Sequence, residues 1–305
     1  RAVFVDDALR VGRIEYFSDA PGKPDQSEGS AGEALSEHIA ELLQGAQTDI
    51  VFETPYLVLS TRARSIFRDL YKRTPRVQVT VSTNSLAATD AFYVYALSHK
   101  YKKRYLKRYG FHIYEFKPFP GDAAEFVNDY DELAGSGNVG EYERFGQTPL
   151  KRHGVRLGLH AKSLVIDESV AMIGSHNFDP RSDNYNTESG FIIHDREVAK
   201  RVRTAVLRNT EPQNAWVIGK RERPHVIDSA NNAISDISTA LPLFDFWPFR
   251  YATSYQLKPD CVPKPETEKH SCYEDVGEFP EVDLPMKTIY TRIVTAFGAG
   301  LVGIL

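Results

Sequence analysis

Two segments decide how this chain folds and what it can do. They are Leu159-His160-Ala161-Lys162-Ser163-Leu164-Val165-Ile166-Asp167 and, a short distance further on, Gly174-Ser175-His176-Asn177. The first segment is rich in aliphatic residues, which predicts a strand over residues 158–166. Residues two apart on a strand point to the same face of a sheet. We therefore expect His160 and Lys162 to project side by side, with Ala161 and Ser163 pointing the other way.

The second segment closes a predicted β-hairpin. A turn at Asp167-Glu168-Ser169 joins the first strand to a partner strand over Val170–Ile173. The hairpin returns Ser175 and Asn177 to the edge from which the imidazole and the ammonium project. Lysine neutralises a phosphate oxygen, while histidine attacks phosphorus or protonates a leaving oxygen. Because a hydroxyl and an amide add further donors, the pattern predicts phosphate-ester chemistry that needs no metal ion and no other cofactor.

Together, the segments resemble the signature of the phospholipase D superfamily, His-x-Lys-x4-Asp followed by Gly-Ser-x-Asn. Over residues 1–217 the chain resembles the C-terminal half of a bacterial cardiolipin synthase. This likeness is carried by Asn177-Phe178-Asp179-Pro180-Arg181-Ser182, Asn186-Thr187-Glu188 and Thr83-Asn84-Ser85-Leu86-Ala87-Ala88-Thr89-Asp90. The resemblance implies a phosphatidyltransferase that makes cardiolipin from phospholipids through a phosphohistidine. Transfer to water would make it a phospholipase D, and a nuclease of the same superfamily is the third alternative.

The resemblance also implies a role for each catalytic candidate. His160 is the nucleophile that forms the phosphohistidine, or the general acid for the departing alcohol. Lys162 and Asn177 bind phosphate oxygens, with support from Ser175. Glu188 matches the acidic residue that orients a histidine, usually the one from the opposite motif. A fixed imidazole tautomer is what a two-step transfer requires.

Four further candidates are less closely tied to the reacting atoms. Asp167 completes the catalytic motif, and we expect it to brace the hairpin turn rather than contact substrate. Asn84 and Ser85 follow a predicted strand, at the end where α/β sheets place ligand sites. They contribute to substrate binding, or they cap a helix predicted to begin just after them. Arg181 binds a headgroup phosphate, or it forms an ion pair with a neighbouring aspartate.

The chain contains one copy of a motif that such sites use twice, so that one histidine attacks while the other moves protons. None of its other eight histidines is followed by lysine and aspartate at the required spacing. The expected partners are therefore a phospholipid substrate at a membrane surface and a second lobe with the same motif. That lobe is supplied by an N-terminal half missing from this sequence or by a second copy of the chain.

Around the motif, strands and helices alternate. The predicted elements are helices over 33–44, 61–72, 89–108 and 196–207, and strands over 49–53, 77–81, 111–116 and 187–194. This rhythm predicts an α/β lobe of the phospholipase D type, with a mixed, mostly parallel sheet sandwiched between helices. We expect the catalytic lobe over 1–218, a Pro-rich irregular extension over 219–288 and an apolar C-terminal helix over 289–305.

Composition limits the partners and the location. A formal net charge of −4 does not attract nucleic acid, which we do not expect as a partner. Residues 99–108 are basic, and form either a phosphate-binding patch or a solvated helix face.

Since no run of about 18 apolar residues is present, we expect peripheral association with the bacterial inner membrane, on either face. Cys261 and Cys272 form a disulfide in an oxidising compartment, or remain thiols in the cytoplasm.

Overall fold

A computed structural model describes residues 8–23, 33–135, 147–222, 251–262 and 272–298. The strands are β1 (Ile14–Ser18), β2 (Asp49–Glu53), β3 (Gln78–Asn84), β4 (Phe111–Phe116), β5 (Ser163–Ile166), β6 (Val170–Gly174), β7 (Ser189–Ile193), β8 (Ala215–Lys220), β9 (Ala252–Leu257) and β10 (Tyr273–Gly277). The helices are α1 (Glu33–Gly45), α2 (Thr61–Tyr71), α3 (Phe92–Arg108), α4 (Ala123–Phe126), α5 (Tyr130–Gly135), α6 (Pro180–Asn184), α7 (Arg196–Arg208) and α10 (Met286–Gly298).

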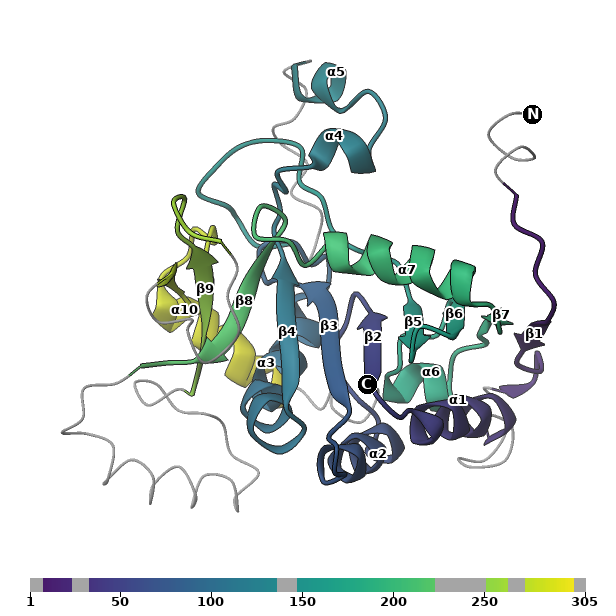
Figure 1. Ribbon diagram of the computed structural model, residues 1–305. Coiled ribbons are helices and arrows are strands. Elements are labelled where there is room, and N and C mark those ends of the chain that lie inside the picture. The colour runs from purple at the N-terminus through teal and green to yellow at the C-terminus, as the bar shows by residue number, and fades with distance from the viewer. Residues whose placement is uncertain (1–7, 24–32, 136–146, 223–250, 263–271, 299–305) are drawn as a thin grey trace.

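These strands form one sheet in the order β1-β7-β6-β5-β2-β3-β4-β8-β9-β10 (Figure 1). The predicted mixed α/β lobe is confirmed, but the expectation of a mostly parallel sheet is wrong. Only the β2–β3 and β3–β4 pairs are parallel among the described strands. Parallel neighbours need a crossover, which α2 and α3 supply, whereas tight turns join antiparallel strands such as β5 and β6. Antiparallel pairs also form between strands far apart in the sequence, namely β1 with β7, β2 with β5 and β4 with β8.

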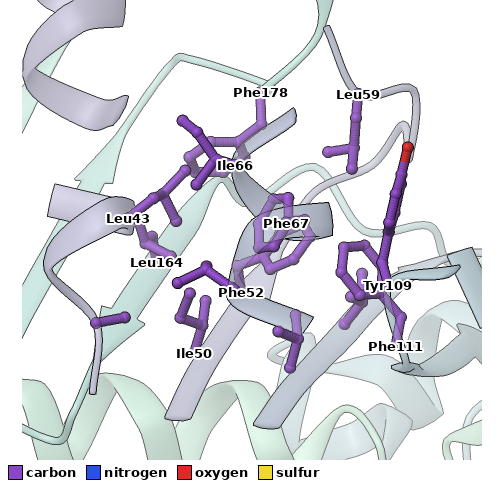
Figure 2. Close-up of a cluster of buried hydrophobic side chains, with 14 of the residues drawn as sticks. Leu43, Ile50, Phe52, Leu59, Ile66, Phe67, Tyr109, Phe111, Leu164 and Phe178 are labelled. Atoms are coloured by element: carbon purple, nitrogen blue, oxygen red, sulfur yellow. The ribbon is translucent and has the colours of Figure 1, made fainter. Parts of the chain in front are cut away.

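Helices cover both faces of the sheet. On one face, α1, α2 and α3 pack on a large core in which Phe52 of β2 contacts Phe67 and Phe111 (Figure 2). On the other face, α7 brings Ala199 against Val165. Successive residues of a strand point to opposite faces, so β5 contributes to both cores. Each large apolar side chain buried in this way stabilises the fold by about 1.5–3 kcal/mol.

The C-terminal residues continue the same sheet. β9 pairs with β8, and β10 pairs with β9, so the prediction of an irregular extension is wrong where this segment is described. Residues 223–250 and 263–271 of that range lie outside the described residues. Cys261 and Cys272 form a disulfide beside the β9–β10 hairpin. Of the two alternatives for these cysteines, the structure has the bonded form.

The α10 helix begins before the predicted C-terminal helix and packs on α3. Ile289 and Ile293 are buried in a second core with Phe92 and Tyr95 of α3. Residues 299–305 of the predicted helix lie outside the described residues. No helix in the described parts of the chain has the length and apolar character needed to cross a bilayer.

The basic stretch on α3 is partly internal. Lys102 and Lys103 are buried, so neither of the two alternatives for residues 99–108 fits them. The Lys102 ammonium lies 2.6 Å from Glu115 Oε1 on β4 and donates to Tyr95 Oη over 2.8 Å. Burying a charge requires a paired and hydrogen-bonded partner, which Glu115 and Tyr95 supply for Lys102. The charge of Lys102 is therefore used within the fold.

Candidate active site

The catalytic candidates gather at the end of the sheet where β2 and β3 finish. His160 and Lys162 precede β5, so the strand is shorter than predicted, although Gly174 N still donates to Lys162 O over 3.1 Å. Lys162 Nζ lies 2.8 Å from His160 Nδ1 and 3.3 Å from His160 Nε2. The imidazole and the ammonium are thus side by side, as the two-residue spacing predicts. His160 is exposed, whereas Lys162 is buried.

Burial and charge act in opposite directions on Lys162. Burial lowers the pKa of its ammonium, while the carboxylates of Glu188, Asp90 and Asp179 oppose that shift by favouring the charged form. These carboxylates come from three different segments that the fold brings around one lysine. The ammonium is therefore partly desolvated, which strengthens its attraction to a phosphate oxygen.

A buried asparagine holds the main chain next to His160. Asn84, the last residue of β3, accepts from Leu159 N over 2.8 Å and donates to Leu159 O over 2.9 Å. Its Nδ2 also donates to Pro55 O over 3.4 Å. The polar atoms of Asn84 are thus engaged by main chain, and the side chain is 3% exposed. This geometry supports neither substrate contact nor helix capping.

Ser85 and Thr54, which lie near Asn84 in the chain or the sheet, each form a hydrogen bond with the main chain. Ser85 Oγ accepts from Ala88 N over 3.1 Å, so it caps a turn, while α3 begins only at Phe92. Directly after the adjacent strand β2, Thr54 Oγ1 donates to Asn177 O over 2.9 Å. The carboxyl ends of the two parallel strands therefore hold both motif segments. The sequence analysis missed Thr54, which only its place after a buried strand could have indicated.

Ser175 and Glu188 form a pair. The Ser175 hydroxyl donates to Glu188 Oε2, and the Glu188 side chain is buried. Glu188 N donates to Asp19 Oδ2 over 3.0 Å, and Lys23 Nζ contacts the same oxygen at 2.6 Å. The buried ion pair of Asp19 and Lys23 therefore fixes the main chain of Glu188, and with it the position of the Glu188 side chain. No motif in the sequence marks Asp19 or Lys23.

Asn177 has unused hydrogen-bonding capacity. The main-chain nitrogen of Asn177 donates to Ser182 Oγ over 3.0 Å. Its side-chain Oδ1 is buried and has no hydrogen-bond partner among the described residues. An unsatisfied buried polar atom costs about 1–3 kcal/mol. An unpaired amide oxygen is suited to a ligand group that donates a hydrogen bond, such as a hydroxyl.

Asp167 lies at the other end of β5, away from His160. Its Oδ1 accepts from Thr48 N over 2.7 Å and from Thr48 Oγ1 over 2.8 Å, and its Oδ2 accepts from Gln47 N over 2.8 Å. Burial raises the pKa of this carboxyl, but these hydrogen bonds outweigh burial and hold the pKa below its ordinary value. Asp167 has a positive φ of 51°, as the tight turn requires. The carboxylate therefore ties the hairpin turn to the start of β2.

The fold does not give Arg181 the predicted aspartate partner. Asp179 Oδ1 accepts from Ser182 N over 2.8 Å at the start of α6, and Asp183 pairs with His176 at 3.1 Å. Arg181 is exposed, and within the described ranges it forms no ion pair with either aspartate. Its guanidinium remains available to an anion.

One aromatic residue beside His160 was missed entirely. The Tyr56 ring lies perpendicular to the His160 ring, with 6.4 Å between the ring centroids. Tyr56 Oη donates to Asp90 Oδ1 over 2.9 Å. Tyr56 follows β2, and only its position after a strand end could have drawn attention to it.

As regards metals, the described residues contain no group of three or more His, Cys, Asp or Glu side chains that could hold an ion.

The chain is similar in sequence to several known proteins. The chain is 26% identical over 208 residues to an uncharacterized protein of Helicobacter pylori strain J99, covering 68% of this chain and 35% of that protein. It is 36% identical over 124 residues to cardiolipin synthase C of Escherichia coli K12, covering 41% of this chain and 22% of that protein. The chain thus spans about a third or less of the length of these relatives.

Solved structures with similar backbones were also found. Nuc, a phospholipase D family member from Salmonella typhimurium, has 14% identity and a TM-score of 0.41, over 66% of this chain and 97% of that one. A phosphatidylserine synthase from Haemophilus influenzae has 13% identity and a TM-score of 0.45, over 74% of this chain and 46% of that one. Residues 39–208, more than half of the chain, match the family model described as "Cardiolipin synthase, PLD-like domain". The chain belongs to this phospholipase-D-like family.

Proposed function

We propose that this chain is one lobe of a phosphatidyltransferase that makes cardiolipin from phospholipids through a phosphohistidine. The observation that carries the proposal is the contact of Lys162 Nζ with His160, 2.8 Å from Nδ1, in a chain of the cardiolipin synthase domain family. A cation beside an exposed imidazole suits nucleophilic attack on a phosphodiester, because it neutralises charge that develops on the phosphoryl oxygens.

The reaction has two steps that share one site. A ring nitrogen of His160 attacks phosphorus, the bond from phosphorus to the oxygen of the donor alcohol breaks, and that alcohol leaves with a proton. The hydroxyl of phosphatidylglycerol then attacks phosphorus, gives up its proton, and displaces the imidazole. The second histidine of the complete site moves these protons, and the two histidines exchange roles if attack starts from the other lobe. Asn177 and Lys162 bind the phosphoryl oxygens, with Ser175 and its partner Glu188 beside them.

The charges near His160 support the need for a second lobe. Glu188, Asp90 and Asp179 all lie close enough to Lys162 to favour its charged form. Three carboxylates near one ammonium oppose the binding of a phosphodiester anion, because like charges repel it. A second lobe would add a histidine and a lysine to the groups that contact the phosphate. We propose that this lobe is another part of a longer polypeptide or a second copy of this chain, and that the assembly works at the surface of the bacterial inner membrane.

The two competing activities make different demands on the site. A phospholipase D would pass the phosphatidyl group to water, and differs only in what reaches the phosphohistidine. A nuclease would need a cationic surface for the nucleic-acid backbone. The net charge is −4, and Lys102 and Lys103 of the basic stretch are buried within the fold. These observations favour a lipid substrate over nucleic acid.

The test compares His160→Ala with wild type in a preparation that contains both lobes. Phosphatidylglycerol and phosphatidylethanolamine vesicles are supplied, and cardiolipin, phosphatidic acid and released alcohol are measured by mass spectrometry. We expect the variant to lose turnover by at least about a thousandfold, as loss of a covalent nucleophile or its proton donor does. His112→Ala is the matched control, because His112 bonds to Gln78 at the opposite end of β3. Wild-type production of phosphatidic acid alone would replace the transferase proposal with hydrolysis.

A further inference from the structure

Tyr56 and Asp90 form an ordered pair next to the reacting histidine. Tyr56 follows β2 and Asp90 follows β3, so two neighbouring strand ends bring them together. The Tyr56 hydroxyl donates to Asp90 Oδ1 over 2.9 Å, and its ring meets the His160 ring edge-on at an interplanar angle of 86°. Neither residue is needed for attack on phosphorus in the mechanism above.

The pair presents an open carboxylate oxygen to the site. Asp90 is exposed, and its Oδ2 has no hydrogen bond to any other residue that the structure describes. Burial raises the pKa of the Tyr56 hydroxyl, and the hydrogen bond to Asp90 raises it further, so the phenol stays protonated and keeps donating. Because Tyr56 occupies Oδ1, the carboxylate is held in one orientation. Its second oxygen remains able to accept a hydrogen bond.

The charge of this carboxylate limits what it can bind. A phosphate held at Lys162 and His160 is anionic, so a neighbouring carboxylate repels it and faces another part of the substrate. A phosphodiester has such a part in the alcohol beyond the ester oxygen. A carboxylate accepts strong hydrogen bonds from a hydroxyl or an ammonium, and it gains nothing from an alkyl group.

We propose that Tyr56 and Asp90 form the subsite for the alcohol portion of the phosphodiester, where Asp90 recognises a second hydrogen-bond donor on that alcohol. The inference rests on the proposed phosphatidyl transfer and adds to it a class of alcohol. The preferred alcohols carry a hydroxyl or ammonium next to the reacting hydroxyl, as glycerol and ethanolamine headgroups do. A plain alkyl alcohol of the same size lacks this group.

The experiment is a competition for the phosphatidyl group. Wild type, Asp90→Ala and Asp90→Asn, each in a preparation with both lobes, receive phosphatidylglycerol vesicles with isotopically labelled glycerol, ethanolamine or 1-propanol as acceptor, and the labelled phospholipid that forms is measured by mass spectrometry. We expect wild type to prefer glycerol over 1-propanol by about tenfold, since a site that hydrogen-bonds a hydroxyl rejects an analogue without it. Asp90→Ala should remove this preference, and the loss of its charge near Lys162 should in addition change the rates with all three acceptors by the same factor. Tyr56→Phe should weaken the preference partially, because Asp90 is then no longer held.

The outcomes separate the subsite from the proposed function. If wild type prefers ethanolamine and Asp90→Asn loses this preference, the group recognised is an ammonium. If wild type prefers glycerol and Asp90→Asn retains this preference, the group recognised is a hydroxyl. A uniform change of rate in Asp90→Ala that leaves the wild-type preference intact would overturn the subsite, because the residue would then act on the reacting groups or the fold. If wild type transfers to no acceptor, the transfer proposal fails and the subsite fails with it. Asp131→Ala, at an exposed position on α5, is the matched control.

Discussion

Asn84 and Leu159 exchange two hydrogen bonds, one in each direction, at the point where β3 ends and the catalytic segment begins. The Asn84 amide accepts from Leu159 N over 2.8 Å and donates to Leu159 O over 2.9 Å. The main chain at Gly158 also lies close to the segment after β3, because a Cβ on Gly158 would lie 2.7 Å from Ala88 O. The main chain immediately before His160 is therefore fixed by the sheet.

The first prediction is that Asn84→Ala reduces turnover by about 10- to 100-fold with little change in KM, because catalysis is lost when reacting groups move by about 1 Å. The free energy of unfolding should also fall, by about 1–3 kcal/mol, since Leu159 loses a partner for its N–H and C=O. Steady-state kinetics and thermal unfolding of the same preparations provide the two measurements.

The control for this prediction is Asn214→Ala. Asn214 is fully buried, donates to Asp122 Oδ2 and Arg208 O, and accepts from Asp122 N, but it lies at the turn between α7 and β8. Its loss should lower stability by a similar amount without lowering turnover at a temperature where the protein is folded. Equal losses of turnover in the two variants would show that Asn84 acts only through general stability.

The second prediction concerns Asp167, which we expect to contribute to stability rather than to the chemical step. Its carboxylate accepts hydrogen bonds from Thr48 and Gln47, and its removal would leave those main-chain donors without this partner. Asp167→Ala should lower the free energy of unfolding by about 1–3 kcal/mol while turnover of the folded protein stays within about threefold of wild type. Urea unfolding and kinetics at low temperature measure both. A loss of turnover comparable to that of His160→Ala would show that Asp167 belongs to the chemistry.

The third prediction is a pH dependence from Glu53. Burial raises the pKa of this carboxyl from 4.5 to about 6, although Asn209 Nδ2 donates to its Oε2 over 2.6 Å. The folded state therefore holds this proton more tightly than the unfolded state. Its contribution to the free energy of unfolding falls as pH rises from 4.5 to about 6, and the cost persists at higher pH.

Glu53→Gln removes that cost and keeps an oxygen that can accept from Asn209. We expect the variant to be more stable than wild type at pH 7, by up to about 2 kcal/mol, and to lose this advantage below pH 4.5. Urea unfolding at pH 4, 5.5 and 7 measures the difference. Glu132→Gln, at an exposed position on α5, should show no such pH dependence. A Glu53 variant with equal stability differences at all three pH values would contradict the assigned cause.

The fourth prediction follows from the bond between Cys261 and Cys272. Disulfides persist in oxidising compartments and are rare in the cytoplasm. We therefore expect the lobe to face the outer side of the bacterial inner membrane. Acid-quenched cells, treated with a thiol-alkylating reagent before and after reduction, should show label only after reduction. Label at both cysteines before reduction would place the lobe on the cytoplasmic side.

The sequence by itself predicted that His160 and Lys162 lie side by side, and it predicted the α/β class. The two residues precede β5 instead of lying on a strand, but they are only two positions apart, so their contact depends on the local main chain. The helices over 61–71 and 196–208 were also predictable, because one apolar stripe with polar residues opposite it is a local pattern. Local chemistry is sufficient wherever the interacting residues are close in the chain.

Only the tertiary structure decided what surrounds that pair. Asn84 is 75 residues from Leu159, and Thr54 is 123 residues from Asn177, so no sequence window contains either interaction. The direction of each strand depended on whether the chain crossed over or turned back, which apolar patterns do not record. Tyr56 and Asp90 meet His160 because β2 and β3 end at the same edge as the segment before β5. Strand pairing is a long-range property, and it turned a recognisable motif into a site with defined neighbours.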